Sequence, residues 1–403
     1  MTTAPTAGPV PRLRATAGPA LLSYGFRPFF LLSGGGALAT LTLWMLSFQG
    51  LLDLSSTAFD PLAWHAHEML FGFAAAAVAG FILTAVPNWT GRLPLQGRPL
   101  LLLVGLSVAG RVAVITSAII GGWTAAVIDV AFLAVLLAAV AREIVAGRNW
   151  RNLPVVAALA VLCGANIAFH IGALTAFGTD VPARLSISTL IVLICLIGGR
   201  IIPSFSRNWL AKQGRGRLPA GFGGFDKLAL AVTVAAMACW TFAPQSQVTG
   251  GAAAIAAACN LARLVRWAGE RTAREPLLWI LHVAYLWIPA GLGLLALSAF
   301  NGAVSPSAGL HALTAGAIAT MILAVMTRAT LGHTGRALHA GAGTTVLYVL
   351  ILLAGISRVA ASLDVTVFTP LIILSAVAWT AAFGFFLGVY GPMLVRPRLQ
   401  PGK

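Results

Sequence analysis

Two imidazoles and a carboxylate stand together at the head of a long apolar run. His65, His67 and Glu68 begin this run, which continues without further charge to Val86. Ionisable side chains at the head of a membrane-length helix are costly unless they are paired or ligated, so they indicate a functional site. His65 and His67 are two residues apart, about 200° around a helix, and cannot hold one metal from the same face. The spacing predicts two centres, with Glu68 on the face of His65, where it can orient that imidazole or add a ligand.

The composition places this run in a membrane. Of 403 residues, 59% are hydrophobic and 9% are charged, whereas a soluble domain carries about 25% charged residues. The net charge of +16 would suit a nucleic-acid partner in a soluble protein, but the basic residues lie in short clusters between apolar runs. The positive-inside rule explains this distribution better. We therefore expect the lipid bilayer as the surroundings of the protein and no nucleic acid as a partner.

Twelve apolar runs are long enough to cross a bilayer. A span needs about 20 apolar residues, and no segment shows the alternation of a β-strand, which argues against a barrel. The sequence therefore predicts an all-α integral membrane protein. The expected spans are 26–48, 66–88, 99–120, 121–146, 153–177, 184–204, 226–244, 247–268, 276–299, 306–328, 342–362 and 366–392, with a tight turn at Gly121-Gly122 between the third and the fourth.

Loop charge predicts the orientation of the bundle. Basic residues gather in the loops on one side, whereas the other side has only Arg184 and Arg358. The basic side is expected to be cytoplasmic, so both termini are predicted there. We expect a disordered tail over residues 1–20, a single membrane domain over 21–395 and a basic cytoplasmic tail over 396–403.

A weak internal repeat links span two with span ten. Shifting the chain by 244 residues aligns His67 with His311 and Gly72 with Gly316 without a gap. Span six ends on a related segment at 203–209. Together these segments hint at three four-helix quasi-repeats.

The predicted topology sorts the histidines by depth. His65, His67 and His311 lie near the outer ends of their spans, and His170 lies in the outer half of span five. His282 lies in the inner half of span nine. His170 and His282 are further candidate metal ligands, and a histidine hydrogen-bonded within the core is an equally good account of either one alone.

A haem is the ligand that the symmetric pair favours. His67 and His311 share depth and repeat position, as two axial ligands of one iron would. Gly72 and Gly316, about 1.5 turns deeper, would leave room for the flat macrocycle. Arg200, near the inner end of span six, is a candidate partner for a propionate. Snorkelling to the membrane surface is the alternative account of this arginine.

Six short motifs, each weak alone, are together specific. They are GFRPFF (25–30), WHAHEM (64–69), PNWTG (87–91), Asn166 with His170, GRIIP (199–203) and MTRATLGHTG (326–335). Through them the chain resembles the NnrS family of bacterial membrane proteins over nearly its whole length. The resemblance implies a multi-pass protein of the bacterial cytoplasmic membrane that is linked to growth under nitric oxide. It also implies haem, expected to be of the b type, and copper.

A more distant similarity connects the chain with the catalytic subunit of haem–copper oxidases and nitric oxide reductases. Those proteins also have twelve helices in three quasi-repeats, with the low-spin haem histidines on helices two and ten. They place the ligands of their non-haem metal on helices six and seven, but residues 184–245 here contain no histidine. A second metal would have to use other residues, such as His65, His170 or Glu68.

Three classes of function are compatible with the sequence. In the first, the protein binds or reduces nitric oxide at a metal in the outer third of the bilayer, with Glu68 and His65 as catalytic candidates. A haem-dependent nitric oxide reductase would also need a quinol or cytochrome as electron donor. The second class is a secondary transporter of a metal or small anion, which twelve spans and internal repeats suit. Asp129 is the single acidic residue near mid-membrane and gives such a transporter little to couple to protons or sodium. A signalling or assembly partner without turnover is the third.

Overall fold

The computed structural model describes residues 18–302 and 304–399, and within them twelve helices are long and apolar enough to cross a membrane. No strand occurs in these ranges, so the predicted all-α membrane fold is confirmed. The spans are α1 (Phe26–Phe48), α2–η2–α3 (Pro61–Thr90), α4 (Gly97–Ile115), α6 (Gly122–Ala146), η3–α7 (Trp150–Leu174), α8–η4–α9 (Asp180–Leu210), α10 (Gly224–Phe242), α11 (Gln247–Val265), α12 (Pro276–Asn301), α13–η6–α14 (Pro306–His333), α15 (Ala342–Leu363) and η7–α16 (Val365–Val395).

Several helix boundaries differ from the prediction, such as span six, which was expected over 184–204 and lies at Asp180–Leu210, and two of the differences have clear local reasons. The second span begins at Pro61, five residues before the expected start, because the Asp60 side chain accepts hydrogen bonds from the backbone N–H groups of Leu62 and Ala63. Proline at the first helical position completes this N-terminal cap. The third span ends at Ile115, and a separate short helix, α5 (Ser117–Ile120), follows it. The predicted turn is present, since Gly121 has a φ of 90°, which favours glycine.

Spans two, six and ten form the centre of the bundle. In their most apolar stretches 72%, 67% and 67% of the residues are buried, against 33% to 44% for seven of the outer spans. Each central span contains a π-helical segment: η2 (Glu68–Ala74), η4 (Ile194–Gly198) and η6 (Ala312–Ile318). Segments η2 and η6 are related by the same shift of 244 residues that aligns His67 with His311. The repeat therefore extends to an uncommon backbone feature that often occurs at functional sites.

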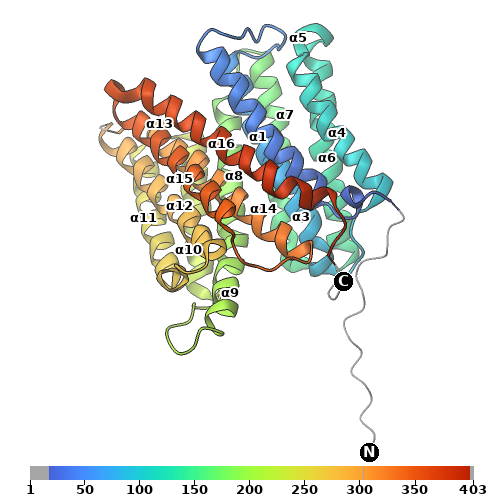
Figure 1. The fold of residues 1–403 in the computed structure, drawn as a ribbon. Coiled ribbons are helices and arrows are strands. Elements are labelled where there is room, and N and C mark those ends of the chain that lie inside the picture. The colour runs from blue at the N-terminus through green and yellow to red at the C-terminus, as the bar shows by residue number, and fades with distance from the viewer. Residues whose placement is uncertain (1–17, 303, 400–403) are drawn as a thin grey trace, which may run out of the picture.

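The two ends of the membrane domain are joined by Arg27. Its side chain is buried, and one guanidinium nitrogen donates to the carbonyl oxygens of Leu394 at 2.8 Å and Arg396 at 2.6 Å. These carbonyls lie at the C-terminal end of α16 and have no helical partner of their own. Figure 1 shows α1 in blue crossing α16 in red, and the two helices are in contact. Residues 1–17 of the predicted N-terminal tail and 400–403 of the predicted C-terminal tail lie outside the described residues.

Candidate functional site

A cluster of polar side chains lies buried toward the end of the bundle that is predicted to face outward. Asp129 of α6 is its centre. The Nε2 atoms of His67 (α2, Pro61–His67) and His170 (α7, Leu153–Leu174) lie 3.3 Å and 2.9 Å from Asp129 Oδ2. The Asn166 amide donates to the same oxygen at 2.9 Å. All four residues are at most 1% exposed, so solvent does not balance their charges or hydrogen bonds.

The helices bring these residues together for simple geometric reasons. Asn166 and His170 are four residues apart, so both point from the same face of α7. His67 is the last residue of α2, directly before the π-helical segment η2. Asp129 lies where α6 crosses α4 most closely, because an added Cβ on Gly110 of α4 would be 2.6 Å from Asp129 Oδ1 and 3.1 Å from its Cα. Glycine at position 110 therefore permits the crossing that places Asp129.

Glu68 and Arg111 complete the cluster on the other side of His67. Glu68 Oε1 lies 3.3 Å from His67 Nδ1 and 2.5 Å from a terminal nitrogen of Arg111. The other terminal nitrogen of Arg111 is paired with Asp129. The guanidinium thus bridges the two buried carboxylates. With neutral imidazoles, two carboxylates and one guanidinium leave a formal charge of −1, which is unfavourable in a buried membrane site.

Three acceptor atoms face one another in the centre of this cluster. The side-chain nitrogen of Asn166 donates to Asp129. This orientation of the amide turns the Oδ1 atom of Asn166 toward His67 Nε2, at a distance of 3.1 Å. If the Nδ1 proton of His67 is donated to Glu68, then Nε2 carries a lone pair that faces both Asp129 and Asn166. A proton on both nitrogens of His67, a proton on Glu68 that is donated to His67 Nδ1, or a cation among the three acceptors would each satisfy these contacts. The ligand atoms of His67, Asp129 and His170 all lie within 4.8 Å of one another, so they can hold one metal ion.

Aromatic side chains enclose the two imidazoles. Phe59 packs against the rings of His67 and His170 at centroid distances of 5.3 Å and 5.4 Å, and Phe71 and Phe169 pack against His67 at 5.0 Å and 5.3 Å. Phe59 belongs to the loop before α2. Ser117 of α5 accepts the backbone N–H of Ala58 at 2.8 Å and thereby fixes this loop. The aromatic rings thus shield the two imidazoles from bulk water, whereas the Arg111 side chain is 24% exposed.

His65 and His311 lie away from this cluster. The ring of His65 stacks on Trp44 of α1 with a centroid distance of 4.4 Å. His311 Nδ1 is 2.8 Å from the carbonyl oxygen of Ser307, and His311 interacts electrostatically with Arg358 and His65. Among the described residues, no hydrogen bond, ion pair or ring contact joins His67 to His311. The structure thus brings His67 together with His170 and places His65 in the neighbourhood of His311.

The glycines expected to make room for a macrocycle have close neighbours. An added Cβ on Gly316 would lie 2.5 Å from the Trp287 ring, and one on Gly72 would lie 3.1 Å from Glu68 and 3.2 Å from Arg111. Side chains therefore pack against both glycines in this structure. Haem ligation by His67 and His311 stays a prediction.

The remaining predicted site residues lie toward the opposite end of the bundle. His282 Nε2 is 2.8 Å from the Ser206 hydroxyl, far from Asp129 in the fold, and forms a polar contact between α12 and α9 (Gly199–Leu210). The Arg200 guanidinium lies over the Phe222 ring at 5.1 Å. Neither residue contributes to the cluster around Asp129.

Asp129 and Arg111 are the cluster residues that the sequence interpretation missed. Each is an isolated charge inside an otherwise apolar span, and the two spans are joined by the short turn at Gly121. Because charges inside a membrane bundle normally pair with one another, this combination was the available signal. It predicts an ion pair between neighbouring spans, and His67, His170 and Asn166 then gather around that pair.

A glycine substitution tests whether the close crossing of α4 and α6 builds the cluster. We expect Gly110→Ala to lower the free energy of unfolding by about 1–3 kcal/mol, because the added methyl group must displace Asp129. Gly105→Ala in the same helix is the matched control, since nothing lies within 4 Å of its added Cβ. Alanine there should be neutral or stabilise the helix by up to about 1 kcal/mol. Equal effects of both substitutions on thermal unfolding in detergent would contradict this account.

Twelve spans around a buried cluster of histidine and carboxylate side chains define a multi-pass membrane protein with a candidate metal centre. A comparison with protein families matches residues 20–398 to the model described as NnrS protein. The chain therefore belongs to the NnrS family. This membership fits a role related to nitric oxide in general. No curated protein matches the chain.

Proposed function

We propose that this protein binds nitric oxide at a copper or iron ion held by His67, His170 and Asp129, and that this is its part in the response to nitric oxide. The observation that carries the proposal is the convergence of acceptors at His67 Nε2, Asp129 Oδ2 and Asn166 Oδ1. A metal cation would satisfy all three and would neutralise the excess negative charge. Family membership supports nitric oxide as the ligand.

The donor set suits a transition metal. Imidazole binds copper, iron and zinc, and two histidines with one carboxylate are typical of mononuclear iron centres that keep open positions. Ligating histidines normally donate their second ring N–H to a carboxylate, which fixes the tautomer and the ring orientation. Glu68 is placed to accept from His67 Nδ1 in this way. In this proposal Glu68 orients His67, whereas the sequence placed Glu68 beside His65 and made it a catalytic candidate.

Each surrounding residue has a separate task in this proposal. A reduced copper or iron ion held by His67, His170 and Asp129 would supply a centre able to bind nitric oxide. Arg111 balances the carboxylates of Glu68 and Asp129, and Asn166 fixes the orientation of the Asp129 carboxylate through its amide. Phe59 and Phe169 exclude water while leaving an apolar approach for a small uncharged gas.

Binding and reduction of nitric oxide differ in what they require. Reduction of two NO molecules to N2O and water consumes two electrons and two protons. A quinol or cytochrome would have to supply the electrons, and that donor stays a prediction, as does a b-type haem. The proposal made here is metal-dependent binding of nitric oxide, and formation of N2O by the purified protein would extend it to catalysis.

Metal content measured on purified variants tests the proposal. We expect wild-type protein to retain copper or iron, and His67→Ala and His170→Ala to lose it at least about tenfold, because each removes a ligand. His282→Ala is the matched control, since His282 is also a buried membrane histidine but contacts Ser206. Nitric oxide added to reduced protein should change the optical and electron paramagnetic resonance spectra of the wild type and the control only.

Two results would count against this function. Wild-type protein purified without copper or iron, and unable to take up either, would show that a proton on His67 or Glu68 satisfies the cluster instead. Unchanged metal content in both His67→Ala and His170→Ala would place the metal elsewhere in the protein.

A further inference from the structure

A second cavity lies at the other end of the bundle, on the predicted cytoplasmic side. It has a volume of about 530 Å3 and is bounded by α3 (Ala75–Thr90), by α9 and by α14 (Ala319–His333). These helices are the inner halves of the three central spans. The cavity is therefore separated from the cluster around Asp129 by half the length of the bundle.

The mouth of this cavity is cationic. Arg200 and Arg328 line it, and an adjoining hollow that shares Arg200 adds Arg148 and Arg151. No aspartate or glutamate lines either space. Charges of one sign in a low-dielectric cleft attract a ligand of the opposite sign. An anionic group is accordingly the ligand chemistry that this mouth favours.

Both central arginines are held in place by aromatic rings. The Arg200 guanidinium lies over Phe222 at 5.1 Å, and the Arg328 guanidinium lies over Phe205 at 4.3 Å. Stacking fixes the plane of a guanidinium and leaves its N–H groups free along the edge. Within the described residues neither arginine forms a salt bridge, and the buried Nε atom of Arg200 has no hydrogen-bond partner. Glu275 interacts with Arg328 electrostatically, but no salt bridge joins them.

The deep end of the cavity is apolar. Phe81, Ile197, Ile201 and Val325 line both this cavity and a second, smaller space of about 90 Å3 between the same three spans. All residues around that second space are apolar side chains or glycine. A ligand that fills both spaces must combine an acid group at one end with an apolar body at the other.

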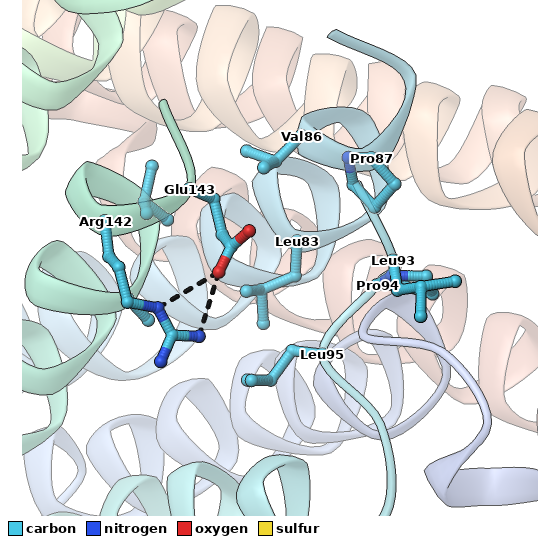
Figure 2. Close-up of a pocket in the computed structure, with 10 residues that line it drawn as sticks. Leu83, Val86, Pro87, Leu93, Pro94, Leu95, Arg142 and Glu143 are labelled. Atoms are coloured by element: carbon cyan, nitrogen blue, oxygen red, sulfur yellow. Dashed lines mark hydrogen bonds and ion pairs between the residues drawn. The ribbon is translucent and has the colours of Figure 1, made fainter. Parts of the chain in front are cut away.

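A smaller pocket at the predicted cytoplasmic end of the bundle differs in that its charged side chains are paired with one another. Figure 2 shows the small pocket beside α3 and α6, where the carboxylate of Glu143 is paired with the guanidinium of Arg142. Arg92 pairs with the same carboxylate. The charges of that pocket are already satisfied within the protein, whereas those of Arg200 and Arg328 are not.

We propose that the cavity between α3, α9 and α14 binds an anionic amphiphile, with its carboxylate or phosphate on Arg200 and Arg328 and its apolar body between the central spans. The proposal is independent of the metal cluster around Asp129. A fatty acid, an anionic phospholipid and a porphyrin with propionates share this chemistry. The experiment distinguishes these three sources.

Binding of oleate to purified protein in detergent is the direct measurement. We expect Arg200→Gln and Arg328→Gln each to weaken oleate binding about tenfold or more, because each removes a charge-assisted hydrogen bond. Oleyl alcohol has the same chain without the acid group and should bind weakly and equally to all variants. Val325→Trp should weaken oleate binding by filling the junction between the two spaces. Arg142→Gln is the control, since Arg142 lies outside this cavity and is 68% exposed.

The bound material in protein as purified identifies the source. Phosphatidylglycerol seen by native mass spectrometry and lost from the Arg200→Gln/Arg328→Gln double variant would identify a phospholipid. A haem absorption band lost from the same variant would identify a porphyrin. The proposal is overturned if the folded double variant binds oleate and phosphatidylglycerol as the wild type does and keeps any haem band. It is equally overturned if oleyl alcohol binds as tightly as oleate.

Discussion

Replacing Arg111 by methionine is expected to lower the free energy of unfolding by about 3–5 kcal/mol, because the change leaves two buried carboxylates without their shared cation. Glu68 and Asp129 are 6% and 1% exposed, so water cannot take over the role of the guanidinium. Methionine fills a similar volume with apolar atoms, which limits the effect of a new cavity. Thermal or denaturant unfolding of purified protein in detergent measures the difference.

A surface ion pair provides the control for Arg111. Arg92 pairs with Glu143 at the opposite end of α3, and its side chain is 46% exposed. We expect Arg92→Met to change stability by less than about 1 kcal/mol, since exposed pairs contribute little. Equal effects of Arg92→Met and Arg111→Met on the free energy of unfolding would show that the charge of Arg111 does not stabilise the cluster around Asp129.

The same variant separates the two accounts of the cluster. If a metal cation occupies the site, added copper or iron should restore part of the stability lost in Arg111→Met, because binding to the folded state alone stabilises it. If His67 or Glu68 carries the balancing proton instead, added metal should leave the unfolding transition of the variant unchanged. This comparison needs no knowledge of catalytic activity.

The spans were predictable because apolar length is a strong signal in a membrane protein. The first span was expected over 26–48 and lies at Phe26–Phe48. The start of the second span was misplaced because Asp60 and Pro61 form a cap that hydrophobicity does not reveal. The π-helical segments were not predicted, since a 3.6-residue period was assumed throughout. Segment η2 begins directly after His67, where the direction of each side chain decides the site.

The candidate site was only partly predictable for a related reason. His67 and His170 were expected at similar depth, and the structure places their rings 4.9 Å apart. The sequence interpretation joined His67 to His311 through the repeat. Repeat position does not predict which polar side chains are drawn to a buried charge such as that of Asp129. The ion pair of Arg111 with Asp129 decides where polar groups gather, and it depends on the crossing at Gly110. Haem ligation by His67 and His311 stays a prediction.

A second buried ion pair explains the glycine at position 199 of span six. Arg263 of α11 is fully buried and donates to Asp226 Oδ1 at 2.8 Å. It also donates to the carbonyl oxygen of Cys195 at 2.8 Å, within the π-helical segment η4, where backbone carbonyls lose their usual helical partners. An added Cβ on Gly199 would lie 1.8 Å from this guanidinium. Glycine at 199 is therefore required for Arg263 to reach the backbone of η4.

Arg263→Met is consequently expected to lower the free energy of unfolding by about 3–5 kcal/mol, since it removes the closer cation of the buried Asp226 and leaves only Arg266 at 3.7 Å. Arg263→Met/Asp226→Asn should recover most of this loss, because asparagine removes the charge and still accepts from the backbone N–H of Gly223. Arg217→Met is the control, since Arg217 and Glu270 form a pair that is about half exposed on both sides. Its effect should stay below about 1 kcal/mol.

If the double variant is no more stable than Arg263→Met, the loss arises from the freed carbonyl of Cys195 and not from the buried charge. Metal content per folded chain should be unchanged in all three variants, because none of the substituted residues belongs to the cluster around Asp129.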